Sequence, residues 1–256
     1  MRKIIKNILI KTTGYRFISN NKYNVLNKSF RFLKLKNEPH LDKKFFEICS
    51  SLEKIYNKEL VEETNYTAYL ITKNIITQNI KGCIVECGVH EGQKISIFIE
   101  TLKLLNVYDR DIYIVDTYEG MTEPSKNDFQ VINNRKLKQG DLYYSLEQVK
   151  SNITKSGYPN DKLHFIKMDV RGEKNLKNNI IDDIALLRCD TDLYDSTLST
   201  LEALYYKVIK NGYIIHDDYG HWKGHYDACH EFYTKNNIKP CFIRTCRKEM
   251  VEVKSA

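Results

Sequence analysis

The chain has 256 residues, of which 42% are hydrophobic and 29% charged, so it can bury a sizeable core as one large domain or as one domain with an extension. Ten of its 40 basic residues lie in residues 1–37, which contain no acid, so 30 basic and 33 acidic residues remain in the rest of the chain. This nearly neutral body argues against a nucleic-acid-binding groove, and no nucleic-acid partner is expected.

The basic segment is predicted to form a helical extension over residues 1–60, followed by a domain over 61–256. Three roles stay open for it: a helix that covers the active site or a second subunit, a contact with an anionic membrane surface or substrate, and a solvated tail. Lys6 and Asn7 interrupt its apolar stretch, which argues against a signal peptide. No stretch has the apolar length of a transmembrane segment.

The seven cysteines are an odd number without a CxxC pair, which is typical of free, mostly buried thiols in a reducing cytoplasm. We therefore expect a cytoplasmic protein, and we expect it to be a homo-oligomer.

Beyond the extension, the chain alternates short apolar runs with amphipathic segments. Helices are expected within 41–80 and over 93–105, 143–153, 196–209 and 225–237. Strands are expected over 83–88, 111–116, 162–169, 184–190 and 213–218, with a terminal hairpin at 241–245 and 250–254. This alternation predicts an α/β fold: a mostly parallel sheet with helices on both faces.

The predicted strands share one feature, which is an acid at the carboxyl end. These residues are Glu86, Asp116, Asp169, Asp190 and the pair Asp217-Asp218. Any one of them could cap a helix, but capping is a poor explanation for five strands together. Ligands of parallel sheets bind beyond the carboxyl ends of the strands, so these acids indicate one binding rim.

The stretch "ECGVHEGQ" at 86–93 indicates a nucleoside site. Gly88 permits a sharp turn and Gly92 a close helix start, with helix amides that favour an anionic group. Asp116 stands where a ribose diol is held, and Asp169 could accept from an adenine amino group. The pattern fits both S-adenosylmethionine (SAM) and NAD, and the lack of a third glycine favours SAM.

The second half of the domain indicates a metal site. Asp190 and the pair Asp217-Asp218 are separated by one helix and one strand, so they are expected side by side. Three converging carboxylates suit Mg²⁺ or another divalent cation. Asp192 is then free to act as a general base. Cys189 and His216 are expected to face away, and a Zn²⁺ site is disfavoured because the Cys/His spacing is irregular.

Four stretches resemble the macrocin O-methyltransferase (TylF-type) family: "IVECGVHEGQ", "IYIVDTYEGM", "LLRCDTDLYDSTLSTLEALYYKVIKNGYIIHDDYG" and "WKGHYDACHEF". The resemblance covers residues from about 62 to the end. It implies a class I SAM-methyltransferase fold with a Rossmann-like, seven-stranded sheet whose last strand is antiparallel. It also implies SAM- and Mg²⁺-dependent methylation of a sugar hydroxyl.

The resemblance further implies roles for individual residues. Asp190, Asp217 and Asp218 would hold the metal, and Asp192 would be the general base. The SAM pocket would contain Thr67, Glu86, Gly88, Gly92, Asp116, Tyr118 and Asp169. The chain departs from the family pattern at His90-Glu91 and Thr117-Tyr118, and most strongly in the loop 121–140, which is expected to close over the acceptor.

Two other functions are compatible with parts of the sequence. A glycosyltransferase could use the D-x-D at 190–192 to hold a metal and a sugar diphosphate, but that leaves the glycine loop and Asp116 without a role. A methyltransferase-like domain kept only for binding would be expected to have lost at least one acid. The favoured function is therefore methyl transfer to a sugar, with a nucleotide-activated sugar for surface polysaccharide preferred over a glycosylated natural product.

Overall fold

The structure, a computed structural model, describes residues 42–171, 173–180 and 183–255. A compact unit begins at Lys44. The basic segment 1–37 lies outside the described residues, so its helical form and its role stay predictions.

The described residues form one seven-stranded sheet in the order β3-β2-β1-β4-β5-β7-β6. The strands are β1 (Cys83–Cys87), β2 (Ile112–Asp116), β3 (Leu163–Lys167), β4 (Ile184–Cys189), β5 (Val208–His216), β6 (Cys241–Arg244) and β7 (Met250–Val253). Strands β1 to β5 pair in parallel, whereas β7 runs antiparallel to both of its neighbours. The predicted sheet, with its antiparallel last strand, is confirmed.

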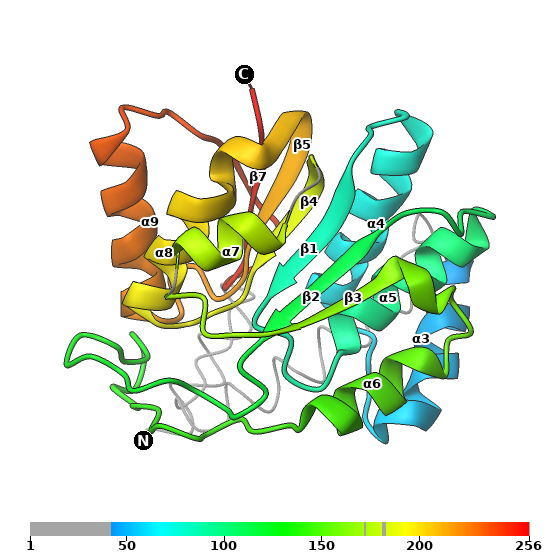
Figure 1. Cartoon of the computed structure of the whole chain (residues 1–256), viewed down its shortest axis with the longest axis horizontal. Coiled ribbons are helices and arrows are strands. Elements are labelled where there is room, and N and C mark those ends of the chain that lie inside the picture. Colours follow the sequence, from blue (N-terminus) through cyan, green and yellow to red (C-terminus); the bar gives the residue numbers. More distant parts are fainter. Residues whose placement is uncertain (1–41, 172, 181–182, 256) are drawn as a thin grey trace, which may run out of the picture. The chain divides into compact units, whose positions relative to one another are not determined.

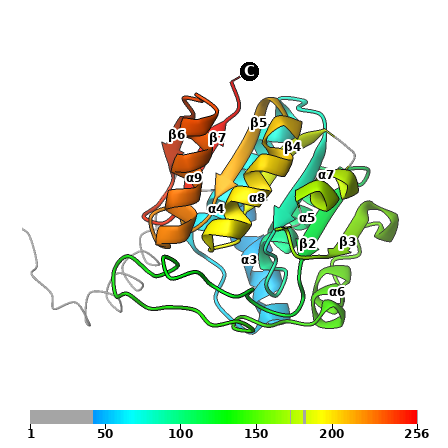
Figure 2. The ribbon, with the colours of Figure 1, turned by 60° about the vertical axis from the view of Figure 1, so that its left-hand side comes forward.

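Helices cover both faces of this sheet (Figures 1 and 2). One side carries α3 (Lys43–Tyr56), α4 (Glu63–Thr77), α5 (Gln93–Leu104) and α6 (Leu146–Thr154). The other carries α7 (Glu173–Asn179), α8 (Tyr194–Leu204) and α9 (Lys223–Lys235). Two short 3-10 turns, η1 (Asn160–Lys162) and η2 (Tyr205–Lys207), precede β3 and β5.

The core lies where the central strands meet these helices. Every residue of β1 and β4 is buried, which is why their sequences are apolar without alternation, apart from Glu86 and Arg188, which pair with each other. Helix α3 also belongs to this core, although it precedes the predicted domain boundary at residue 60. Its Tyr56 hydroxyl donates to the carbonyl of Gly92 (2.9 Å) and so joins α3 to the start of α5.

Two elements differ from expectation. The predicted helix 196–209 ends at Leu204, because Val208 already pairs with Ile184 as the first residue of β5. Valine and isoleucine are β-branched and suit a strand better than a helix end. Helix α7 was not predicted, since Leu176 is the one apolar residue in its sequence, EKNLKNN.

The structure describes all seven cysteines, and no disulfide bond joins any of them, as expected. Five of them are buried. Among the helices of the described residues, none combines the length and the apolar composition that a membrane crossing requires.

Candidate active site

One cavity of about 280 Å³ lies at the carboxyl ends of the parallel strands. The acids that end these strands all line it: Glu86, Asp116, Asp169, Asp190, Asp217 and Asp218. Asp192 and Gly88 line it as well. The predicted rim of acids is therefore one continuous site, with the glycine loop at one end and the D-x-D segment at the other.

Asp116 organises the first half of the cavity. Its carboxylate accepts from the amides of Val89 (2.7 Å) and His90 (3.2 Å) and, through the other oxygen, from the amide of Tyr118 (2.9 Å). The loops after β1 and β2 are thus tied to one side chain. A ribose at this position would meet a carboxylate that is already fixed in place.

Gly88 brings the glycine loop against the D-x-D segment. Its φ is +85°, and a Cβ there would lie 2.0 Å from the carbonyl oxygen of Asp190. Only glycine permits this backbone approach, which places the glycine loop next to the D-x-D segment.

Gly88→Ala should therefore lower the free energy of unfolding by about 2 kcal/mol or more, from the positive φ and the backbone clash together. Gly157→Ala is the matched control, because Gly157 also has a positive φ but open space around its Cβ position. Its loss should be about 1 kcal/mol. Denaturant unfolding measures both, and equal losses would contradict the role of the close approach.

The second half of the cavity holds the acidic cluster, defined here as Asp190, Asp192, Asp217 and Asp218. One carboxylate oxygen from each of Asp190, Asp192 and Asp218 lies within 4.8 Å of the others. The Oδ1 atoms of Asp192, Asp217 and Asp218 are buried without a hydrogen-bond partner, although the Lys248 ammonium lies 3.4 Å from that of Asp218. Asp192 (φ 56°) and Asp218 (φ 53°) adopt left-handed backbone conformations, a strain that is common at functional sites.

Arg188 is the charge partner of this cluster and was missed in the sequence. Its buried guanidinium pairs with Glu86, with Asp190 (2.7 Å) and with Asp217 (3.0 Å). An arginine inside an otherwise apolar buried strand was the available signal, because a buried cation requires an anionic partner.

The pKa values of the acids in this cluster shift in different directions. Burial and the neighbouring carboxylates raise the pKa of Asp192, and burial likewise raises that of Asp190 although Arg188 opposes it. Burial disfavours the charge of Asp217, but Arg188 and Lys248 outweigh it and hold its pKa low. Asp217 is therefore the acid whose charge is best balanced by the chain itself.

The cluster fits a hard divalent cation. Its unpartnered oxygens are the ligand type that Mg²⁺ and Ca²⁺ prefer, and a cation would relieve the repulsion that raises the pKa of Asp192. In this geometry Asp192, rather than Asp217, shares the closest grouping with Asp190 and Asp218.

Three predicted cofactor-binding residues, Thr67, Gly92 and Tyr118, are absent from the cavity wall, and a fourth, Asp169, is already paired with an arginine. Thr67, on α4, donates to the carbonyl of Glu63 (3.0 Å), and the hydroxyl of buried Tyr118 donates to Ile114 (2.9 Å). The Cβ position of Gly92 faces Ile153. Asp169 lines the cavity, but its carboxylate is bound by the Arg171 guanidinium (2.6 Å).

Two further lining residues had not been singled out. Gln93, at the start of α5, has a buried Nε2 without a partner. Lys248, in the β6–β7 connection, lies 3.4 Å from Asp218 and 3.8 Å from Asp217. They add a free donor near the glycine loop and a cation beside the acids.

The loop 121–145 is anchored beside the acidic cluster. Buried Asp128 accepts from the amide of Tyr194 at the start of α8 (2.9 Å), and Val131 donates to the carbonyl of His221 (2.9 Å). This long green segment runs past the carboxyl ends of the strands in Figure 1.

The sheet order, the glycine loop and the strand-end acids together define a class I SAM-dependent methyltransferase fold. Among solved structures, the O-methyltransferase NovP superimposes with a TM-score of 0.67 at 25% identity, over 76% of this chain and 80% of NovP. The profile of the Macrocin-O-methyltransferase (TylF) family matches residues 67–246, so the chain belongs to that family.

Curated relatives carry related names. Demethyldecarbamoylnovobiocin O-methyltransferase of Streptomyces niveus is 30% identical over 170 residues, covering 65% of this chain and 63% of the relative. A 4′-O-methyltransferase of Streptomyces olivaceus, named for a rhamnosyl tetracenomycin, is 30% identical over 162 residues, covering 62% and 59%. The matches therefore span less than two thirds of either relative.

Proposed function

We propose that this protein transfers the methyl group of SAM to a sugar hydroxyl with the help of a divalent cation. The observation that carries this proposal is the single cavity in which the glycine loop and Asp116 adjoin the acidic cluster. Family membership and the relatives' names support it. The glycosyltransferase alternative gains no support from either.

Residues of the first half would hold SAM. Asp116 is placed for the ribose, and the unpartnered Oε2 of Glu86 is placed for a cationic group such as the SAM ammonium. The unpartnered amide of Gln93 could donate to the SAM carboxylate. All three side chains line the same cavity as Gly88 of the glycine loop.

In the acidic cluster, Asp192 is proposed as the general base. Asp190, Asp217 and Asp218 are proposed to hold the cation, which when bound would lower the pKa of the acceptor hydroxyl. The hydroxyl oxygen attacks the methyl carbon, the carbon–sulfur bond breaks, and Asp192 takes the proton. The products are a methyl ether and S-adenosylhomocysteine.

A nucleotide-activated sugar is the proposed acceptor, on a route to surface polysaccharide. A second cavity of about 460 Å³ within the loop 121–145 is lined by three lysines, Lys126, Lys136 and Lys138, and by one acid, Glu123. Lysines of this kind suit a diphosphate. We further propose a cytoplasmic location, in keeping with the lack of disulfide bonds among the described cysteines, and a homo-oligomeric state.

Replacing Lys136 and Lys138 with Gln should raise the KM for a nucleotide sugar about tenfold, roughly 1.4 kcal/mol, because two phosphate contacts are lost. The value of kcat, and the KM for SAM, should stay near wild type. Steady-state kinetics at low salt measures this. An unchanged KM would argue for a neutral glycoside as acceptor.

The experiment that tests the proposed methyl transfer combines calorimetry with a transfer assay. SAM is titrated into the wild type and into Asp190→Ala/Asp217→Ala, with and without Mg²⁺. Radiolabelled SAM is then offered with a panel of nucleotide sugars and glycosides. SAM binding that survives the double substitution, with transfer lost, supports the proposed division of the cavity. Absence of SAM binding under all conditions would overturn the proposal.

A further inference from the structure

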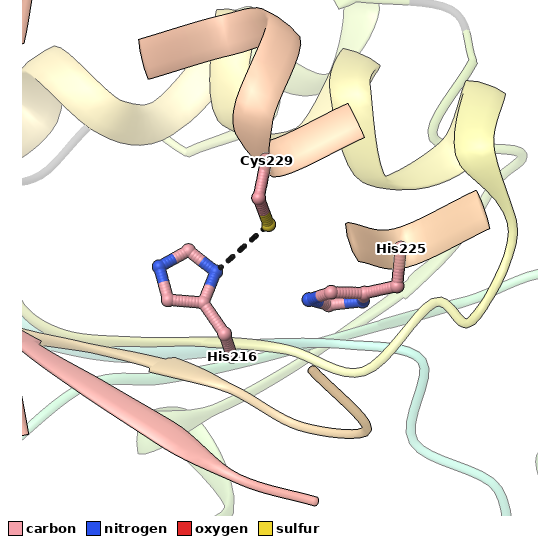
Figure 3. Close-up of side chains that lie close together, drawn as sticks. All are labelled: His216, His225 and Cys229. Atoms are coloured by element: carbon pink, nitrogen blue, oxygen red, sulfur yellow. Dashed lines mark hydrogen bonds between the residues drawn. The ribbon is translucent and has the colours of Figure 1, made fainter. Parts of the chain in front are cut away.

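Three side chains with metal-binding atoms meet between β5 and α9, apart from the acid-lined cavity. His216 is the last residue of β5, and His225 and Cys229 stand one helical turn apart on α9. All three are fully buried. One ligand atom from each lies within 4.8 Å of the other two, and Figure 3 shows the side chains converging.

The outer nitrogen of His216 is already held by the protein. Its Nε2 lies 2.9 Å from the Tyr233 hydroxyl, which itself donates to Glu252. Since Tyr233 gives its proton to Glu252, it accepts from Nε2–H, and Nδ1 keeps its lone pair. That lone pair faces the Cys229 sulfur at 3.4 Å. A fixed outer hydrogen bond of this kind is typical of metal-binding histidines.

His225 has the same arrangement. Its Nδ1 lies 3.3 Å from the hydroxyl of Thr197. Its Nε2 is buried and has no hydrogen-bond partner, and Figure 3 shows that ring nitrogen directed toward His216 and Cys229. An unpaired ring nitrogen in a fully buried position is costly, and a bound cation would satisfy it.

We propose that His216 Nδ1, His225 Nε2 and Cys229 Sγ form a site for a soft transition-metal cation such as Zn²⁺. Zinc bonds of about 2.3 Å to sulfur and 2.0 Å to nitrogen give a tetrahedral sulfur–nitrogen separation of about 3.5 Å. The present separation of 3.4 Å between Cys229 and His216 meets this value. Mg²⁺, which prefers oxygen ligands, would not compete here.

The protonation states suit such a site. Burial lowers the pKa of His225 to about 3, so its ring is neutral. Burial raises the pKa of Cys229, so the thiol keeps its proton until a metal binds. On binding, the metal–sulfur bond forms, the S–H bond breaks and the proton passes to solvent. The bound metal would fasten α9 to the strand that leads into Asp217 and Asp218.

The test uses the full chain, produced in cells supplied with Co²⁺ and purified under reducing conditions with excess Mg²⁺. We expect one Co²⁺ per chain with a thiolate-to-cobalt charge-transfer absorption band. Cys229→Ser should remove the band. Added Zn²⁺ should displace the Co²⁺ and so remove the band as well. Cys241→Ser, which alters an exposed cysteine, is the matched control and should keep it.

A folded wild type without the band, or a band lost in Cys241→Ser instead, would overturn the proposal. If Cys229→Ser does not fold, X-ray absorption on the wild type decides the matter. One sulfur and two nitrogen neighbours are expected, and a shell of oxygen alone would contradict the site. None of these readouts depends on methyl transfer, so the outcome is independent of the proposed enzymatic activity.

Discussion

Asp192→Asn should lower kcat by about 10²- to 10⁴-fold, the usual range for loss of a general base, while the protein still binds Mg²⁺ and SAM. The amide keeps the shape of the side chain, but it cannot take the proton of the acceptor hydroxyl. Stopped assays give kcat, and calorimetry gives the two dissociation constants.

Asp217→Asn is the matched comparison, because both residues are buried acids of the same cluster. If Asp217 is a metal ligand, this variant should weaken Mg²⁺ binding, and high Mg²⁺ should partly restore activity. Asp192→Asn should show no such rescue.

The opposite result is also informative. Asp192 shares the tightest grouping with Asp190 and Asp218, whereas Asp217 faces Arg188. If Asp192→Asn abolishes Mg²⁺ binding and Asp217→Asn leaves it intact, the metal ligands are Asp190, Asp192 and Asp218. Another group must then act as the base.

The parallel part of the fold was predictable because strands β1 to β5 are rich in apolar residues and an acid or a glycine stands at or within two residues of each carboxyl end. The parallel order then placed those acids along one edge without any knowledge of packing. The end of α8 was not predictable in this way, because Val208 and Ile209 continue the helical spacing although the chain has already entered β5. Pairing with Ile184 settles that choice, and pairing is a tertiary effect.

The interaction partners of the site residues were not predictable either, because they too depend on tertiary structure. Sequence spacing placed Asp116 and Asp190 at strand ends, but it could not show that Asp116 is occupied by loop amides. It also missed the cluster of His216, His225 and Cys229, although the four-residue spacing on α9 places two of its members on one helical face. His216 lies on β5, and no regular sequence spacing relates a strand residue to the residues of a helix packed against it.

Arg188→Met should lower the free energy of unfolding by about 3–5 kcal/mol, because it leaves buried carboxylates without their cation. Glu86, Asp190 and Asp217 all pair with this guanidinium. Arg171→Met is the control, since Arg171 pairs with Asp169 in a partly exposed position and should contribute less than about 1 kcal/mol. Denaturant unfolding of both variants measures the difference.

The loss of unfolding free energy in Arg188→Met should also depend on pH. Burial raises the pKa of Glu86 to about 7, although Arg188 lowers it. A carboxyl group with a raised folded-state pKa favours the folded protein at low pH, and that contribution is lost as pH rises through the folded pKa. Removing Arg188 raises this pKa further, so the deficit of Arg188→Met should be smaller at pH ~5 than at pH ~8. A deficit that is the same at both pH values would mean that Arg188 stabilises the fold by packing rather than by charge.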